Sequence, residues 1–94
     1  MGLMNIVVTL DDNKGKQSVT IDVGNKGVNG DVTKRDIMPI VLKELGYEGA
    51  TFYLTGFRYY LGTCIYKLTV SLDGQLFKGH MVNSWTNSKI CKIN

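Results

Sequence analysis

The side chains suited to nucleophilic catalysis are few in this chain. Histidine occurs once, as His80, and the two cysteines are Cys64 and Cys91. A cysteine nucleophile needs a base within hydrogen-bond reach, so only His80 with Cys64 or Cys91 could act in this way. Structural roles are expected for both cysteines, because Cys64 begins a predicted strand and Cys91 lies near the end of the sequence. His80 is expected to face solvent beside Lys67.

The acidic residues and cysteines lack the spacing of a metal site or an acid–base pair. No Cys-x-x-Cys motif is present, and one histidine is too few for the usual zinc ligand sets. Asp11 and Asp12 are adjacent, but their connector lacks the alternating oxygen ligands and final glutamate of a calcium loop. A helix cap, a helix surface and a turn account for Asp36, Glu44 and Asp73. We therefore predict no catalytic residue, no metal and no cofactor.

The two cysteines also bear on the cellular compartment. Cys64 and Cys91 could form one disulfide, but no apolar secretory segment precedes the first predicted strand. We therefore expect reduced thiols and a cytoplasmic location. No apolar run approaches the roughly 18 residues of a membrane span, so no membrane association is expected.

A glycine-spaced stretch over residues 24–31 precedes the predicted helix. Helix N-termini attract anions, which suggests phosphate binding. However, the stretch has no Gly-Lys-Ser/Thr ending and no dinucleotide-binding fingerprint, and its Gly-x-x-Gly follows a strand instead of joining two helices. We therefore predict a surface loop that contacts a partner. Its candidate binding residues are Asn25, Lys26 and Asn29.

Hydrophobic periodicity predicts the elements of the first half. Residues 5–10 and 18–23 alternate apolar and polar side chains, which predicts an antiparallel hairpin. Both apolar sets share a face only if paired residues have an odd index sum, such as Leu10 or Val8 opposite Val19. Residues 1–4 are expected to form a disordered or expression-derived tail.

One amphipathic helix is predicted from about residue 36 or 37. Asp36 is the favoured N-cap, because Pro39 then lies in the first turn, where its missing N–H costs nothing; a looser turn from Thr33 could precede it. Gly46 is expected to end the helix, with Tyr47 packing back on Leu42.

The second half is predicted to form three strands. A bulge at Gly56 would place Phe52, Leu54, Phe57 and Tyr59 on one side of the strand over 51–61. Asp73-Gly74 predicts a two-residue type I′ hairpin, in which Lys67 lies opposite His80 and Thr69 opposite Lys78. Residues 83–94 are expected to form a short edge strand or a tail.

The order strand, strand, helix, strand, strand, strand predicts a single α+β domain over residues 1–94. In this ββαβββ arrangement the helix packs on one face of a twisted antiparallel sheet, and the other face is left open. The open face is expected to carry Thr9, Thr20, Tyr53, Arg58, Tyr60, Lys67, Thr69, Lys78 and His80. The candidate binding residues among these are Tyr53, Arg58, Tyr60, Lys67, Lys78 and His80.

Length and charge narrow the functional class. With 94 residues and a formal charge of +3, the chain is too short for a cleft between domains and too weakly basic for a dedicated polyanion binder. Tyrosine and arginine are enriched at the centres of protein interfaces. We therefore expect a small non-catalytic protein-binding module that acts through the open face, the loop over 24–31 or the exposed edge of a terminal strand.

Two further expectations concern the partner. Small size with lysine, asparagine and isoleucine enrichment is typical of microbial or phage inhibitors and regulators, and a homodimer could form through the open face. The alternative is single-stranded nucleic acid, with tyrosines stacking on bases and basic side chains neutralising phosphates.

Overall fold

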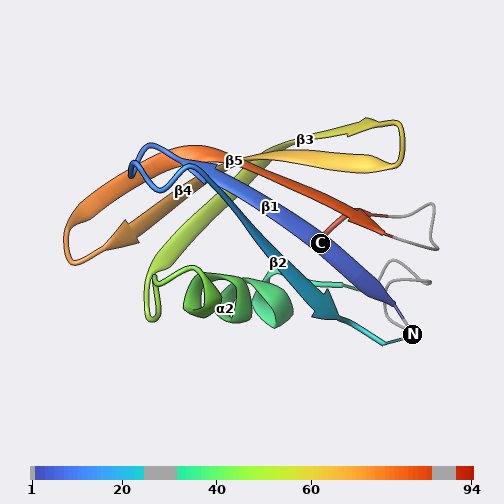
Figure 1. Ribbon diagram of the computed structural model, residues 1–94, viewed down its shortest axis with the longest axis horizontal. Helices are drawn as coiled ribbons and strands as arrows, with labels where there is room; N and C mark the ends of the chain where they lie inside the picture. The colour runs from blue at the N-terminus through green and yellow to red at the C-terminus, as the bar shows by residue number, and fades with distance from the viewer. Residues whose placement is uncertain (1, 25–31, 86–90) are drawn as a thin grey trace.

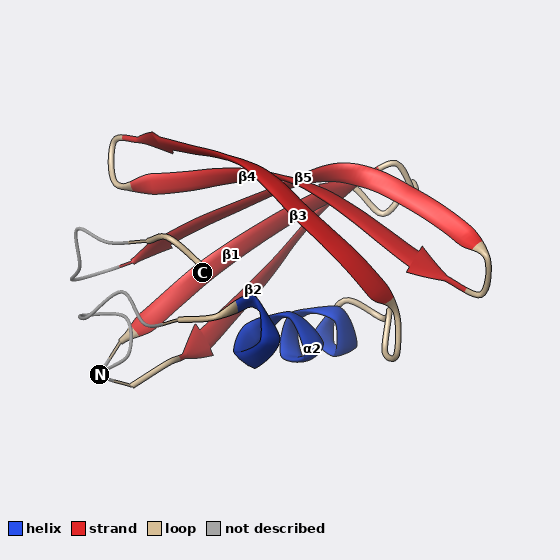
Figure 2. Ribbon diagram, turned by 180° about the vertical axis from the view of Figure 1, so that it is seen from behind, coloured by secondary structure: helices blue, strands red, loops and turns tan. Residues whose placement is uncertain are grey.

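The protein folds as an antiparallel sheet with a helix on one face. The computed structural model describes residues 2–24, 32–85 and 91–94. Its elements are β1 (Leu3–Leu10), β2 (Lys16–Asp22), α2 (Lys34–Glu44), β3 (Thr51–Tyr60), β4 (Thr63–Leu72) and β5 (Gln75–Trp85). The five strands lie side by side in the order β2-β1-β5-β4-β3, and every pairing is antiparallel (Figure 1). Helix α2 lies along one side of the sheet, which confirms the predicted fold class (Figure 2).

The β1–β2 hairpin directs the apolar residues of both strands toward the helix. Met4 lies opposite Ile21 and Ile6 lies opposite Val19, so the index sum is odd as predicted. The two example pairs named for this hairpin do not occur, because β2 begins at Lys16 and the connector is shorter than expected. A shorter connector moves the register along the strands without changing which face each residue occupies.

The predicted features of β3, β4 and β5 are present. The register between β3 and β4 shifts between Thr55 and Arg58, which confirms the bulge at Gly56. Asp73 and Gly74 both have positive φ, 53° and 80°, as a type I′ turn requires. The predicted pairing of β4 with β5 is observed along both strands.

The start of α2 differs from the prediction. Thr33 is the N-cap, since its backbone is extended and its Oγ1 accepts a hydrogen bond of 3.2 Å from the amide of Asp36. The preference for Asp36 as the cap is therefore wrong, and Pro39 lies inside the helix. Pro39 removes one hydrogen bond to the carbonyl of Arg35. Both residues are exposed, so water can bind this carbonyl at little cost.

The end of α2 is as predicted. Gly46 has a φ of 90°, a conformation that a residue without Cβ adopts readily. Its amide donates to the carbonyl of Lys43 at 3.2 Å, and the amide of Tyr47 donates to the carbonyl of Leu42 at 2.7 Å. These two bonds define a Schellman motif, which satisfies two carbonyls of the last turn.

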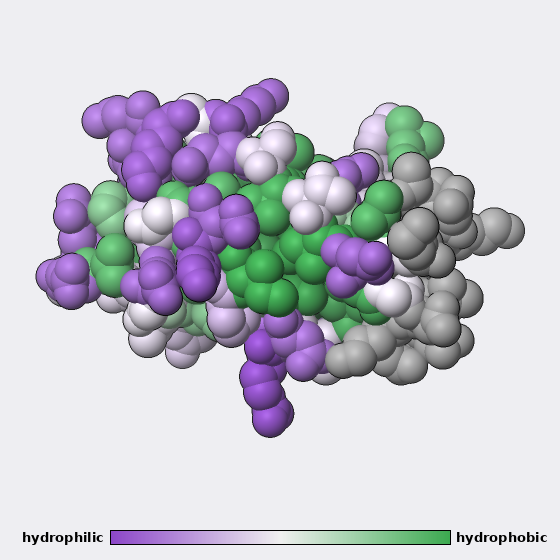
Figure 3. Space-filling model, turned by 60° about the horizontal axis from the view of Figure 1, so that its bottom comes forward, coloured by the Kyte–Doolittle hydropathy of each residue, from purple (hydrophilic) through white to green (hydrophobic). Residues whose placement is uncertain are grey.

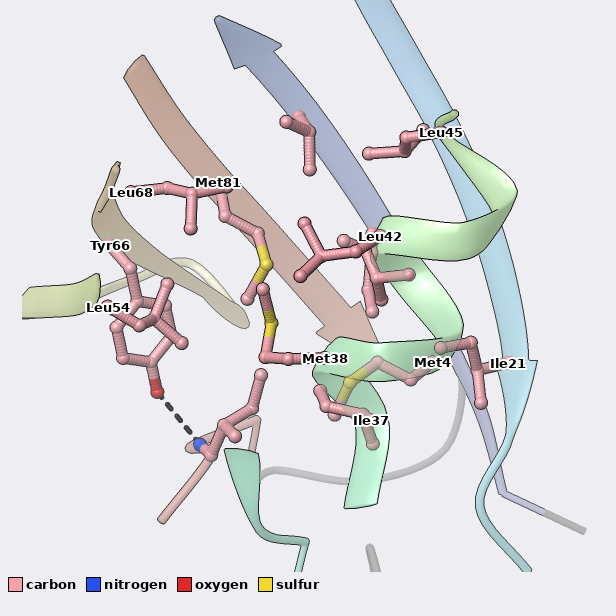
Figure 4. Close-up of a cluster of buried hydrophobic side chains, with 14 of the residues drawn as sticks. Met4, Ile21, Ile37, Met38, Leu42, Leu45, Leu54, Tyr66, Leu68 and Met81 are labelled. Atoms are coloured by element: carbon pink, nitrogen blue, oxygen red, sulfur yellow. Dashed lines mark hydrogen bonds between the residues drawn. The ribbon is translucent and has the colours of Figure 1, made fainter. Parts of the chain in front are cut away.

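The hydrophobic core lies between α2 and the sheet. Figure 4 shows Met38 and Ile37 of the helix directed toward Met4 of β1 and Met81 of β5. Met4 is fully buried, so the prediction of a disordered tail is wrong for residues 3 and 4, which belong to β1. The alternating apolar pattern of β1 extends back to Met4 and explains its burial.

One glycine marks a close approach of two strands that periodicity does not indicate. Gly79 of β5 lies opposite Leu10 of β1, and a Cβ built on it would overlap the carbonyl oxygen of Thr9. No side chain fits in that space, so only glycine allows β1 and β5 to pair at this point.

A disulfide joins Cys64 of β4 to Cys91, and both residues are buried. The prediction of reduced thiols is therefore wrong. The cause is a long-range contact: residues 91–94 return across the helix side of the sheet and bring the two Cα atoms within 5.7 Å, which suits a disulfide. The expectation relied on the apparent compartment and could not detect this approach.

Residues 91–94 form a tail that is anchored to the domain. The amide of Ile93 donates to the hydroxyl of Tyr66 at 2.8 Å, and Ile93 is buried. The amide of Asn94 donates to the carbonyl of Val32, and the amide of Lys34 donates to the carbonyl of Asn94, both at 2.8 Å. Burial raises the pKa of Tyr66, and the hydrogen bond from Ile93 opposes this effect more weakly. The tail therefore connects β4 to the start of α2.

The expected edge strand over 83–94 is not observed in the described residues. Asn83 to Trp85 continue β5, and residues 91–94 are not part of the sheet. Asn83 is fully buried, and its side-chain amide donates to the carbonyl of Cys91. A buried polar side chain of β5 therefore helps to hold the tail.

Candidate functional site

The open face is the side of the sheet that faces away from α2 (Figure 2). The strand registers arrange its side chains in rows across the strands. One row contains Thr55, Lys67, His80, Thr9 and Lys16. The next row contains Arg58, Ile65, Val82, Val7 and Ser18.

Basic side chains gather in the middle of the open face. Two adjoining hollows of about 290 and 370 Å³ share Lys67 and His80 in their linings. Arg58 also lines the first hollow, and Lys78 also lines the second. The described lining of neither hollow contains a carboxylate. An anionic group placed in the first hollow would lie near Arg58, Lys67 and His80.

The carboxylates of this face lie at its margins. Asp11 follows the end of β1, and its Oδ1 accepts a hydrogen bond of 2.8 Å from the amide of Lys78. Asp22 ends β2, and its Oδ1 accepts one of 2.9 Å from the amide of Gly24. Both carboxylates therefore hold local backbone, and Asp11 adjoins the basic group at Lys78.

An apolar row crosses the centre of the open face. Ile65, Val82 and Val7 are neighbours on β4, β5 and β1, and each is half-buried. Basic residues border this row, with Arg58 at its β3 end and Lys67 in the next row. An apolar centre with a polar rim is typical of protein–protein interfaces.

Two tyrosines project from the same face at its β3 margin. Tyr53 is 75% exposed and Tyr60 is 66% exposed, and both belong to the strand at the end of the sheet. They lie opposite Thr69 and Thr63 of β4. The aromatic surface therefore borders the basic centre and does not cover it.

The described residues do not bring a cysteine and a histidine together as a nucleophile and its base. His80 lies on the open face, whereas Cys64 lies on the helix side and is bonded to Cys91. Within residues 2–24, 32–85 and 91–94, no three histidine, cysteine or acidic side chains gather as a metal site. A helix able to cross a bilayer is not found in this part of the chain.

The structure places all six predicted sheet residues on the open face and adds others. Lys16 lies before the predicted strand over 18–23, whereas in the structure it begins β2, in the row of His80. Ile65 and Val82 form the apolar row, and extending the predicted β4–β5 register by one residue would have found them. The predicted loop residues Asn25, Lys26 and Asn29 lie outside the described residues.

Comparison of the chain with protein-family models, with curated proteins and with solved structures gave no match.

Proposed function

We propose that the protein is a small non-catalytic binding module whose open face binds an acidic surface of another protein, as an inhibitor or regulator would. The observation that carries this proposal is the basic centre formed by Arg58, Lys67, Lys78 and His80 around two adjoining hollows. Opposite charge across an interface accelerates association and rejects like-charged partners.

The apolar row favours a protein over a nucleic acid. Ile65, Val82 and Val7 would exclude water against apolar side chains of a partner, with the basic residues pairing around them. A single strand of nucleic acid would need aromatic rings over this centre to stack its bases, and Tyr53 and Tyr60 lie only at the β3 margin. The nucleic-acid alternative therefore has only the rings of Tyr53 and Tyr60 for base stacking among the predicted binding residues, and both lie away from the basic centre.

A second copy of the chain suits this face less well than a different protein. A two-fold axis would bring the same surface of both copies together. Lys67 and Lys78 would then meet like charges across the interface, which is unfavourable.

The test is affinity capture from a lysate of the source organism, with and without nuclease. The bait is compared with a variant carrying Arg58→Glu and Lys67→Glu. The matched control carries Arg35→Glu and Lys43→Glu, the same charge change on exposed positions of α2. The proposal requires a nuclease-resistant partner that the open-face variant loses and the helix variant retains.

Two outcomes would contradict the proposal. A partner that disappears after nuclease treatment, together with binding of a labelled single-stranded oligonucleotide that weakens with salt, would support the nucleic-acid alternative. A protein partner held equally by both variants would show that the open face is not the binding surface.

A further inference from the structure

The turn between β3 and β4 carries an apolar side chain at one end of the sheet. Leu61 and Gly62 form this two-residue turn, and Leu61 is 81% exposed. Figure 1 shows the turn away from α2 and at the opposite end of the molecule from the turn between β4 and β5. In Figure 3, which shows the helix side, the upper right end of the molecule has hydrophobic to near-neutral surface. This end therefore presents apolar surface to solvent.

Leucine is an unfavourable residue for this turn. Leu61 has a φ of 48° and Gly62 one of 80°, nearly the conformation of Asp73 and Gly74, at 53° and 80°, in the other two-residue turn. A left-handed backbone suits Asn, Asp or Gly, and a branched apolar residue adopts it at a cost in free energy. The fold gains little from a leucine side chain that is mostly exposed. Contact with another molecule would explain both the residue and its exposure.

Aromatic side chains flank Leu61 on both faces of the hairpin. Tyr60 lies on the open face and is 66% exposed. Tyr59 lies on the helix side and is 52% exposed. Phe57 also lies on the helix side, where its ring packs against that of Tyr66, and it remains 42% exposed. The leucine is therefore bordered by a ring on each side.

Cationic side chains lie behind these rings on both faces. Arg58 lies on the open face and is exposed. On the helix side, the Nζ of Lys92 lies 5.4 Å from the centre of the Phe57 ring. From residue 49 onward the sequence has one acidic side chain, that of Asp73, and its turn lies at the other end of the sheet. β3, β4 and β5 therefore bring positive charge to the hairpin end and no carboxylate.

Asp22 ends β2 at the same end of the sheet, but it is distant from the hairpin. β1, β5 and β4 lie between β2 and β3. Neighbouring strands are about 4.8 Å apart, which places Asp22 about 19 Å from β3. This distance exceeds the Debye length of about 8 Å at physiological ionic strength, so its charge is largely screened there.

The order of side chains along the hairpin matches the depth profile of an anionic bilayer. Leucine lies at the extremity, tyrosines follow, and the cations lie farther from the tip. A bilayer has hydrocarbon at its centre, an interface that favours tyrosine, and headgroups that attract cations. A pocket of a folded protein would have to enclose both faces of the hairpin, whereas lipid contacts an inserted hairpin from every side.

We propose that the β3–β4 hairpin inserts its tip into the surface of a membrane that contains anionic lipids. Leu61 enters the outer part of the hydrocarbon, and Tyr59 and Tyr60 lie at the interface. Arg58 and Lys92 lie beside the headgroups. This contact differs from the expectation of no membrane association, which considers apolar runs long enough to cross a bilayer. It needs no protein partner on the open face, so it does not rest on the proposed function.

The test measures flotation of the oxidised protein with vesicles of phosphatidylcholine, with and without phosphatidylserine. We expect binding to require the anionic lipid and to weaken as salt rises. Leu61→Asn removes the apolar tip and should weaken binding about tenfold. The midpoint of urea unfolding should stay the same or rise, because asparagine suits the turn. Leu76→Asn is the matched control and should not weaken binding, since Leu76 is 58% exposed beside the other two-residue turn.

Two further pairs of variants separate insertion from attraction to charge. Leu61→Trp should shift tryptophan emission to shorter wavelength on anionic vesicles, because the indole enters an apolar medium, whereas Leu76→Trp should not. Both variants keep the same native tryptophan as background. Lys92→Gln should weaken binding about fivefold through loss of one cation near the anionic surface. Lys43→Gln, at an exposed position of α2, should leave it unchanged.

Four results would overturn the proposal. They are the absence of binding to anionic vesicles, equal binding with and without phosphatidylserine, equal loss in Leu61→Asn and Leu76→Asn, and the same emission shift in both tryptophan variants. If circular dichroism shows that a tryptophan variant fails to fold, flotation of the asparagine variants still decides. A protein partner that Leu61→Asn loses, with no binding to vesicles, would assign the tip to a protein pocket and refute the lipid occupant.

Discussion

Reduction of the disulfide between Cys64 and Cys91 is expected to lower the free energy of unfolding by about 3.5 kcal/mol. The two residues are 27 positions apart, and in the chain-entropy relation a closed loop of this length stabilises the fold by about that amount at 25 °C. This is a large part of the roughly 5–15 kcal/mol that stabilises a typical domain. For a chain of this size the midpoint of thermal unfolding should fall by about 15–25 °C.

The assay is urea unfolding followed by circular dichroism, on oxidised protein and on protein reduced with a phosphine. A variant with Cys64→Ala and Cys91→Ala separates two contributions. Reduced protein retains both buried sulfurs and loses only the covalent loop, whereas the double variant also loses their packing. It should therefore be the least stable of the three forms.

Peptide mapping without reductant first establishes that Cys64 and Cys91 are joined. If complete reduction, verified by thiol counting, changes stability by less than about 1 kcal/mol, the loop-entropy reasoning is wrong for this chain. If mapping finds free thiols in protein purified without reductant, the pairing itself is refuted.

Three further changes test particular contacts. Gly79→Ala should destabilise by about 3 kcal/mol or prevent folding, because the added methyl group would overlap the carbonyl of Thr9; urea midpoints would measure this, and a change below about 1 kcal/mol would contradict the close approach. Thr33→Ala should cost about 1 kcal/mol through loss of the N-cap hydrogen bond, whereas a neutral result in the same assay would argue against the cap. Because the pKa of Tyr66 is raised in the folded state, its contribution is fully present below the unfolded value of 10.0 and is lost as pH rises through the folded pKa. Tyr66→Phe should lower stability at pH 8 by about 1–3 kcal/mol, since the amide of Ile93 loses its acceptor, and should reduce the further loss above pH 10; parallel pH profiles of the two proteins would contradict the assignment.

The sequence was sufficient where local rules decide the structure. Asp73-Gly74 requires a tight turn, and this turn determines the register of β4 and β5 and the face on which Lys67 and His80 lie. Gly56 is needed as a bulge to keep the aromatic residues of β3 on consistent faces. These predictions depend on neighbours in the chain, which the sequence displays directly.

The errors concern contacts between distant parts of the chain or competition between two local rules. The return of residues 91–94 to Tyr66 and Val32 leaves no periodic signal, so the disulfide could not be inferred. At the helix start, the prediction avoids a proline inside the helix, yet Thr33 caps the helix and the exposed carbonyl of Arg35 makes Pro39 tolerable.

The position of β1 in the sheet affects how the chain can fold during synthesis. β1 lies between β2 and β5, and Met4 pairs with Trp85, so the sheet joins segments from nearly opposite ends of the sequence. Long-range pairing of this kind folds slowly, because loop closure must precede the contacts that compensate for it. On the ribosome, the hairpin of β1 and β2 would wait with its apolar side exposed until β5 emerged. We therefore expect the apolar side of this hairpin to favour aggregation until β5 pairs with β1.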